Sequence, residues 1–178
     1  MIKNNIFDVI ISGGGLSGSL MALSLADLKK PDGTLLSIAV VEATGIEVTG
    51  INDSNSTFSS TTNKPNTLFD DRVLALSHGS ASYLEKIGVW QHLSNDGCAI
   101  KKIDISDRGH YGKARLEAHE HGVSALGYVV AMALIGQAQL TELTGKTNVN
   151  WFSPNHIINI NWQPNAATEK IAVTLDSE

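Results

Sequence analysis

The clearest chemical signal in the sequence is a glycine-rich stretch that is followed by a strand ending in an acid. The stretch and the acid comprise Gly13, Gly14, Gly15, Leu16, Ser17, Gly18 and Glu42. The first, third and last glycines form the pattern Gly-x-Gly-x-x-Gly, whose backbone amides hold a nucleotide diphosphate at the start of a helix. The Glu42 carboxylate would accept hydrogen bonds from ribose hydroxyls and would repel a 2′-phosphate. The pattern therefore predicts a dinucleotide site that takes an unphosphorylated adenosine ribose.

The segments around the glycines match the elements that such a site needs. Residues 8–12 form an apolar, β-branched run of strand length, residues 19–28 carry leucines at helical spacing, and residues 37–41 predict a second buried strand. A glycine turn without a ligand would also fit the bare pattern, but it does not explain this order of elements. Glu42 falls later than in a typical fingerprint because residues 29–34 form a Pro/Gly turn that lengthens the connection.

Composition limits the function classes. The 178 residues have a net charge of −5 and no basic cluster, so we expect no nucleic-acid partner. Cys98 is the only cysteine, which excludes an internal disulfide and suits a reducing compartment. No secretory signal opens the sequence, and the longest apolar stretch, residues 125–135, is too short to cross a bilayer. We expect a soluble cytoplasmic protein, and peripheral contact with the inner membrane stays open.

The sequence pattern is different after the predicted strand–helix–strand segment that ends at Glu42. Residues 49–67 are polar and predict a mobile surface loop. Alternating residues at 100–106 and 113–117 predict antiparallel strands, unlike the parallel opening. The other expected elements are a helix at 80–88 that Ser77 starts, a short helix at 89–93, a helix at 129–144, and strands at 148–152, 156–161 and 171–175.

Together these elements predict an α/β protein with a Rossmann-like βαβ unit and an inserted antiparallel sheet. All 178 residues are assigned to one nucleotide-binding domain, in which residues 1–98 and 126–178 supply the nucleotide-binding layer and residues 99–125 begin a second sheet. No metal site is expected, because His119 and His121 lack further ligands at useful spacing. No catalytic residue is predicted either, since Ser77 and His78 are adjacent and point in different directions.

Several segments together resemble one enzyme family. The opening glycine pattern resembles single-component FAD monooxygenases related to para-hydroxybenzoate hydroxylase. Residues 69–77 (Phe-Asp-Asp-Arg-Val-Leu-Ala-Leu-Ser) and 84–90 are similar to the ubiquinone-biosynthesis hydroxylases. Residues 103–112 and 126–130 narrow the resemblance to the 2-polyprenyl-6-methoxyphenol hydroxylase branch.

The resemblance implies an FAD-binding fold of the GR2 type and hydroxylation of a polyprenylated phenol, with NAD(P)H and O2 as co-substrates. It implies that residues 13–18 hold the FAD diphosphate and that Glu42 holds the adenosine ribose. Arg72 and Gln137 would lie beside the ribityl-diphosphate arm. The alternative for Arg72 is a surface arginine paired with Asp70 or Asp71, and the alternative for Gln137 is an ordinary glutamine on a helix surface. Contact with a membrane surface or with a ubiquinone-biosynthesis complex is a further open implication.

The family's later flavin-binding motifs would lie beyond Glu178, so we expect this chain to be an incomplete and inactive fragment. Two alternatives remain, one of them also an enzyme and the other from a different class. The glycine pattern and Glu42 also suit an NAD(P)-binding dehydrogenase-like domain, although no second regular βαβ half follows Glu42. A non-catalytic module with an empty nucleotide site is the other alternative.

Overall fold

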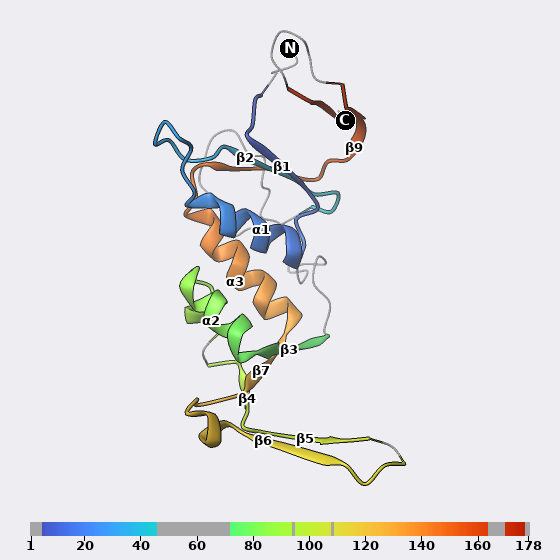
Figure 1. Cartoon of the computed structure of the whole chain (residues 1–178). Helices are drawn as coiled ribbons and strands as arrows, with labels where there is room; N and C mark the ends of the chain where they lie inside the picture. Colours follow the sequence, from blue (N-terminus) through green and yellow to red (C-terminus); the bar gives the residue numbers. More distant parts are fainter. Residues whose placement is uncertain (1–4, 46–71, 94, 108, 164–169, 177–178) are drawn as a thin grey trace. The chain divides into compact units, whose positions relative to one another are not determined.

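The computed structural model describes residues 5–45, 72–93, 95–107, 109–163 and 170–176. The chain divides into two compact units, one made of residues 1–69 and 139–178 and the other of residues 70–138. Figure 1 shows the helices and strands of each. The mixed α/β class expected from the sequence is confirmed. The assignment of nucleotide-binding and second-sheet layers concerns function and stays a prediction.

The first unit contains the expected βαβ element. Strand β1 (Val9–Ser12), helix α1 (Leu16–Ala26) and strand β2 (Ile38–Val41) follow one another, and β1 and β2 are parallel. A third parallel strand, β8 (Val149–Phe152), pairs with the other edge of β2, which gives the order β1-β2-β8. All four residues of β2 are buried, because this strand lies between two neighbours and needs apolar residues on both faces.

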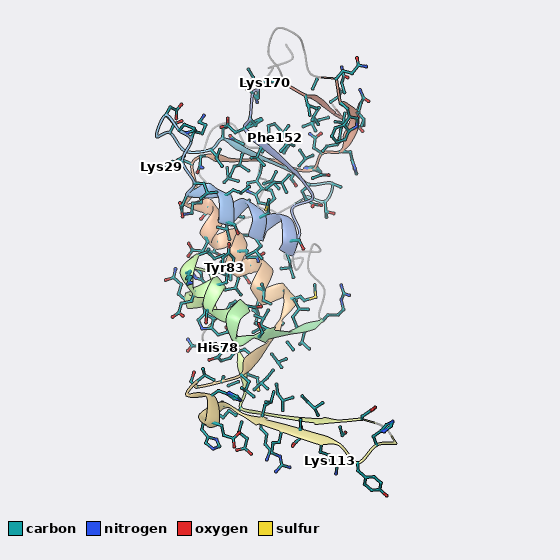
Figure 2. The ribbon with its side chains drawn as sticks, in the orientation of Figure 1. Lys29, His78, Tyr83, Lys113, Phe152 and Lys170 are labelled. Carbon is teal, nitrogen blue, oxygen red and sulfur yellow. The ribbon has the colours of Figure 1, made fainter. Side chains whose placement is uncertain are left out.

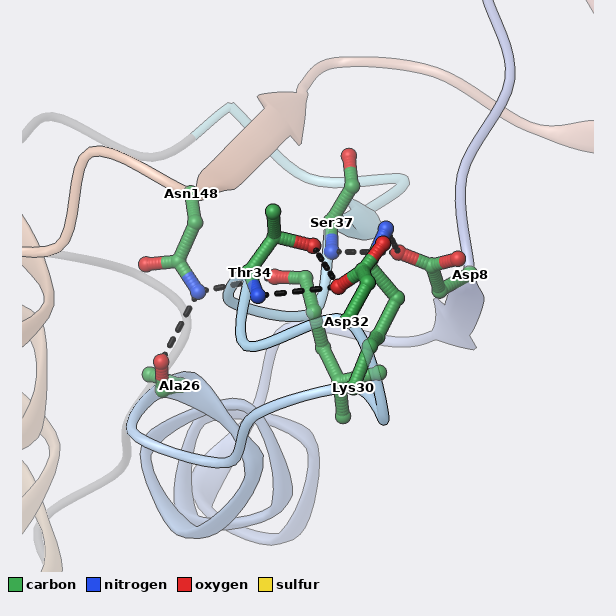
Figure 3. A network of polar contacts seen from close by, with 8 residues as sticks. Asp8, Ala26, Lys30, Asp32, Thr34, Ser37 and Asn148 are labelled. Atoms are coloured by element: carbon green, nitrogen blue, oxygen red, sulfur yellow. Dashed lines mark hydrogen bonds and ion pairs between the residues drawn. The ribbon is translucent and has the colours of Figure 1, made fainter.

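The connection between α1 and β2 is a structured turn, as expected (Figure 3). Gly33 adopts a φ of +86°, which glycine tolerates, and the Lys30 N–H donates to the Thr34 carbonyl at 2.8 Å. The Asp32 carboxylate accepts from the backbone N–H and the hydroxyl of Thr34 at 2.9 and 2.6 Å. At the entry to β1, Asp8 accepts from the Ser37 N–H at 2.8 Å and lies 3.2 Å from the Lys30 amine.

Asn148 joins three segments of this unit from a position just before β8. Its side-chain amide donates to the Ala26 carbonyl at the end of α1 and to the Leu36 carbonyl before β2, both at 2.8 Å (Figure 3). Its own carbonyl accepts from the Ile38 N–H at 2.9 Å. The side chain therefore satisfies an unpaired carbonyl at the end of the helix and links α1 to the sheet.

We predict that Asn148→Ala lowers the free energy of unfolding by about 1–3 kcal/mol, because two partly buried carbonyls lose their donor. Urea denaturation measures the change. Asn150→Ala is the matched control, since the Asn150 amide lies 3.5 Å from the Ile38 carbonyl, at the outer limit for a hydrogen bond. An equal loss in the two variants would contradict the role assigned to Asn148.

Asp8 gives a pH-dependent prediction. The Ser37 N–H, and then the Lys30 amine, hold the pKa of Asp8 below its ordinary value of 3.8. A carboxyl whose pKa is lower in the folded state stabilises the protein above about pH 3.8 and loses this effect as the pH falls through the folded-state pKa. Thermal unfolding of Asp8→Asn should therefore vary less with pH below 4 than that of the parent. Lys30→Met should have a smaller effect, and the reverse ranking would contradict this assignment.

The last two strands of the first unit form an antiparallel hairpin, β9 (Ile157–Asn161) with β10 (Ala172–Leu175). An edge-to-face pair, with ring centroids 5.7 Å apart, joins Phe7 to Phe152 of β8. Phe152 is labelled in Figure 2. The strands expected at 148–152, 156–161 and 171–175 are confirmed to within one residue at each end.

The second unit is built on an antiparallel sheet of order β3-β7-β4, with β3 (Val73–Ser77), β7 (Gly127–Ala131) and β4 (Cys98–Ile100). Helix α2 (His78–Lys86) follows β3 directly. The Ser77 hydroxyl accepts from the Ser80 N–H at 3.1 Å, so Ser77 starts this helix as expected. The short helix after it is the 3₁₀ turn η1 (Trp90–His92), and the Trp90 and Tyr128 rings lie 4.7 Å apart.

A hairpin of β5 (Lys102–Ser106) and β6 (Lys113–Glu117) confirms the expected antiparallel strands, and η2 (Ala118–His121) follows it. Strand β5 starts two residues later than predicted, because Ile100 belongs to β4 and pairs with β7. Figure 2 shows its side chains on both sides, with Lys113 labelled. Ion pairs join Lys102 to Glu117 at 3.2 Å and Arg115 to Asp104 at 2.6 Å on one face. The other face carries Ile103, Ile105, Ala114 and Leu116, and all four are exposed.

The structure corrects the predicted start of one helix, and one predicted loop lies outside the described residues. Helix α3 (Met132–Thr144) begins three residues later than the predicted start at Val129, because Val129 and Ala131 pair with β3 and Val129 also pairs with β4. Hydrogen bonding across two neighbouring strands outweighs the helical spacing of the apolar residues there. The predicted loop at 49–67 lies outside the described residues.

Candidate nucleotide-binding site

The turn that leaves β1 takes its shape from Gly13. Gly13 has a φ of +97°, a left-handed conformation that favours glycine, and its N–H donates to the Val41 carbonyl at 2.7 Å. This bond attaches the turn to the end of β2. The chain can then reverse into α1 within the space of Gly14 and Gly15.

Gly18 and Gly15 are glycines for opposite reasons. A Cβ built on Gly18 would overlap the Gly13 carbonyl and would lie 3.4 Å from the Ile11 side chain, so the first turn of α1 packs directly on the loop and β1. A Cβ built on Gly15 would meet no described atom within 4 Å. Gly15 therefore faces open space, where a side chain would occupy room that a ligand could use.

The start of α1 presents unpaired backbone donors at this open side. Gly15 precedes the helix, and its carbonyl accepts from the Ser19 N–H at 2.9 Å. The amides of Leu16, Ser17 and Gly18 precede that first helical bond, so they have no acceptor within the helix. The positive end of the helix dipole adds to their attraction for an anion.

Glu42 lies beside the glycine loop, immediately after β2. Its Oε2 accepts from the Gly14 N–H at 2.6 Å, and its Oε1 accepts from the Thr44 N–H at 2.7 Å. The residue is only 7% exposed. A carboxylate has about four acceptor positions, so two remain after these bonds. The Ser19 hydroxyl donates to the Gly14 carbonyl at 2.7 Å, which gives the Gly14 backbone a second hydrogen bond.

Three residues around this site were not identified from the sequence. Trp151 of β8 lies against Gly14, so that a Cβ on Gly14 would overlap its ring. The Asn155 N–H donates to the Glu42 carbonyl at 2.8 Å, and the Ser153 hydroxyl donates to the Thr44 carbonyl at 2.7 Å. These residues follow Glu42 by more than 100 positions, so no local pattern links them to it, and only the pairing of β8 with β2 brings them there.

The structure places Arg72 and Gln137 in the other compact unit. Arg72 is exposed before β3, and its carbonyl accepts from the Met132 N–H at 2.8 Å. Gln137 is exposed on α3. Asp70 and Asp71, the alternative partners of Arg72, lie outside the described residues. The flavin-arm roles of Arg72 and Gln137 stay predictions.

In the described ranges, no group of three or more histidine, cysteine, aspartate or glutamate side chains is arranged to hold a metal ion. Over the same ranges, no helix combines the length and the apolar character needed to span a bilayer.

Comparison with known proteins places the fold among monooxygenases. No protein-family model matches the chain. The ubiquinone biosynthesis monooxygenase COQ6 of Danio rerio is 35% identical over 106 residues, which cover 59% of this chain and 19% of that protein. COQ6 of Mus musculus is 26% identical over 142 residues, covering 79% of this chain and 26% of the relative.

The structure agrees with the sequence comparison. The crystal structure of PqsL, a probable FAD-dependent monooxygenase from Pseudomonas aeruginosa, superposes with a TM-score of 0.61 and 17% identity, over 97% of this chain and 39% of PqsL. The chain thus spans about a quarter of the mouse relative's length and about two fifths of the PqsL chain. The resemblance seen in the sequence is confirmed: over most of its length the chain is similar to ubiquinone-biosynthesis monooxygenases, and it has the fold of FAD-dependent monooxygenases.

Alanine substitutions at Gly18 and at Gly15 should have different effects on the free energy of unfolding. Gly18→Ala should lower the free energy of unfolding by about 1–3 kcal/mol or prevent folding, because the new methyl group overlaps backbone that cannot move freely. Gly15→Ala should change stability by less than about 0.5 kcal/mol, since its φ is −64° and its Cβ faces open space. Urea denaturation of both variants compares the losses, and a larger loss for Gly15→Ala would contradict this geometry.

Proposed function

We propose that this chain forms the nucleotide-binding part of an FAD-dependent aromatic hydroxylase. The observation that carries the proposal is the open, amide-lined start of α1 beside the buried Glu42 carboxylate. Amides and a carboxylate side by side suit a ligand that joins a diphosphate to a ribose. The similarity to COQ6 and the fold shared with PqsL favour FAD over other dinucleotides.

The residues present fit this cofactor. The amides of Leu16 and Ser17 would donate to the diphosphate, and the bare backbone at Gly15 would let it approach closely. The free acceptor positions of Glu42 would bind the ribose hydroxyls. Because the carboxylate is held by Gly14 and Thr44, it needs no rearrangement to do so.

The bound flavin would supply the oxygen chemistry, and the protein would supply position and electrostatics. We assign Arg72 and Gln137 to the ribityl-diphosphate arm, NAD(P)H to the electron supply, and no residue of this chain to general-base or nucleophilic catalysis. A polyprenylated phenol is the proposed substrate, on the basis of the ubiquinone-biosynthesis relatives. Such a substrate resides in lipid, so we propose a cytoplasmic location with contact at the inner-membrane surface or with a ubiquinone-biosynthesis complex.

The chain alone should bind FAD weakly and should not turn over substrate, because it spans only a fraction of its relatives. Titration of the chain into FAD, followed by flavin fluorescence, and calorimetric titration with ADP test this proposal. We expect weak, saturable binding of both, and loss of both in Gly15→Ala, which keeps the fold. A tight stoichiometric FAD complex would contradict the expectation that this chain alone holds FAD weakly. Absence of saturable ADP binding, or equal binding by Gly15→Ala, would contradict the site.

Glu42 should determine the discrimination against a 2′-phosphate. Glu42→Gln removes the negative charge at nearly the same side-chain size, and its amide nitrogen no longer accepts from one of the two backbone N–H groups. Measured as a ratio, the affinity for 2′,5′-ADP should rise relative to that for ADP by about tenfold or more, because a like charge at contact distance costs at least about 1.4 kcal/mol in a partly buried site. Competition calorimetry measures the ratio. Asp27→Asn is the charge-matched control, since Asp27 follows the far end of α1 and pairs with Lys146 at 2.7 Å. An unchanged ratio in Glu42→Gln would place the ribose elsewhere.

A further inference from the structure

Strand register brings the Trp151 side chain into contact with the glycine loop. In the parallel sheet, Ile11 of β1 pairs with Val40 of β2, and Val40 pairs with Trp151 of β8. Residues paired in this way lie on the same face of a sheet, and Glu42, two residues beyond Val40, continues that face. The large indole of Trp151 therefore reaches the same side as the glycine loop and the Glu42 side chain.

The contact falls on Gly14, the position that the fingerprint leaves variable. Gly14 is not among the described glycines with positive φ, so its backbone conformation does not require glycine. A Cβ on Gly14 would nevertheless overlap Cζ3 of Trp151, and would lie 3.1 Å from both Cη2 of Trp151 and Cβ of Glu42. Trp151, rather than backbone geometry, is the reason for glycine at this position.

We propose that Trp151 is a positioning residue of the nucleotide site. Its ring packs against Gly14 and keeps this residue where the Gly14 N–H can donate to the Glu42 carboxylate. Three contacts hold the Gly14 backbone: the Trp151 ring lies against it, its N–H donates to the Glu42 carboxylate at 2.6 Å, and its carbonyl accepts from the Ser19 hydroxyl at 2.7 Å. Gly14 leads directly into Gly15 and the free amides of α1. The orientation of those amides toward a diphosphate therefore depends on the ring, and this role rests on the proposed function.

A double-mutant cycle tests the contact without any ligand. Gly14→Ala in the parent should lower the midpoint of thermal unfolding by about 5 °C, which corresponds to a packing overlap in a chain of this size. In Trp151→Leu, whose shorter side chain leaves room for the methyl group, Gly14→Ala should cost less than about 2 °C. If Trp151→Leu does not fold, Trp151→Met replaces it. Additive losses in the cycle would overturn the proposal.

Calorimetric titration with ADP tests the positioning role. Trp151→Leu should weaken ADP binding about tenfold at a temperature where it is fully folded, because small displacements of binding groups are costly. Trp151→Phe keeps a ring under the loop and should bind within about twofold of the parent. Trp162→Leu, at a side chain that is 73% exposed, should leave affinity unchanged.

The outcomes of these experiments test the positioning role of Trp151 separately from the proposed nucleotide site. Equal ADP affinity in Trp151→Leu and the parent would overturn the positioning role while the nucleotide site stands. Failure of the parent to bind ADP would remove the proposed function, and with it the role of Trp151 in binding, whereas the cycle would still measure the coupling of Trp151 to Gly14.

Discussion

The bond from the Gly14 N–H to the Glu42 carboxylate, 2.6 Å long, joins the two halves of the proposed site. One partner belongs to the loop after β1, and the other ends β2. A carboxylate that is only 7% exposed would be costly to bury without hydrogen-bond donors, and the Gly14 and Thr44 amides supply two of them. The same bond fixes where the loop turns into α1. Loop conformation and ribose recognition thus depend on one interaction.

Strand β8, which lies more than 100 residues after β2 in the sequence, completes the site. Strand β8 pairs with β2 and places Trp151 against Gly14. The residues after β8 donate hydrogen bonds to the segment that contains Glu42, from Asn155 to the Glu42 carbonyl and from Ser153 to the Thr44 carbonyl. At the other end of the sheet, Asn148 joins β8 to the end of α1. A βαβ unit of two strands would leave one edge of β2 unpaired and the loop without a support. We therefore regard β1, α1, β2 and β8 as the smallest unit that can form the site.

The sequence predicted the parts of this arrangement that local pattern controls. Alternation, glycine spacing and the Ser77 cap identified β1, α1, β2, the β5–β6 hairpin, the strands β8 to β10 and the start of α2 at Ser77, because these signals lie within a few residues of the elements they specify. The three strands of the β3-β7-β4 sheet were not predicted from these signals. Trp151 and Asn148 could not be assigned roles, since their contacts join residues more than 100 positions apart and depend on strand order and register. The start of α3 was misplaced for the same reason, because pairing of β7 with β3 and β4 decides where the strand ends.

The most direct test of the nucleotide site is a titration of the isotope-labelled chain with ADP, followed by the backbone amide resonances in NMR spectra. The proposed site predicts that the largest shifts occur at Gly15, Leu16 and Ser17, with a second group at Gly14 and Thr44, whose amides bond to Glu42. Glu42→Gln, whose amide oxygen can accept from only one of these two backbone N–H groups, should reduce the shifts of the second group most. Shifts that are absent from residues 13–18, or that cluster on the antiparallel strands of the other unit, would contradict the account.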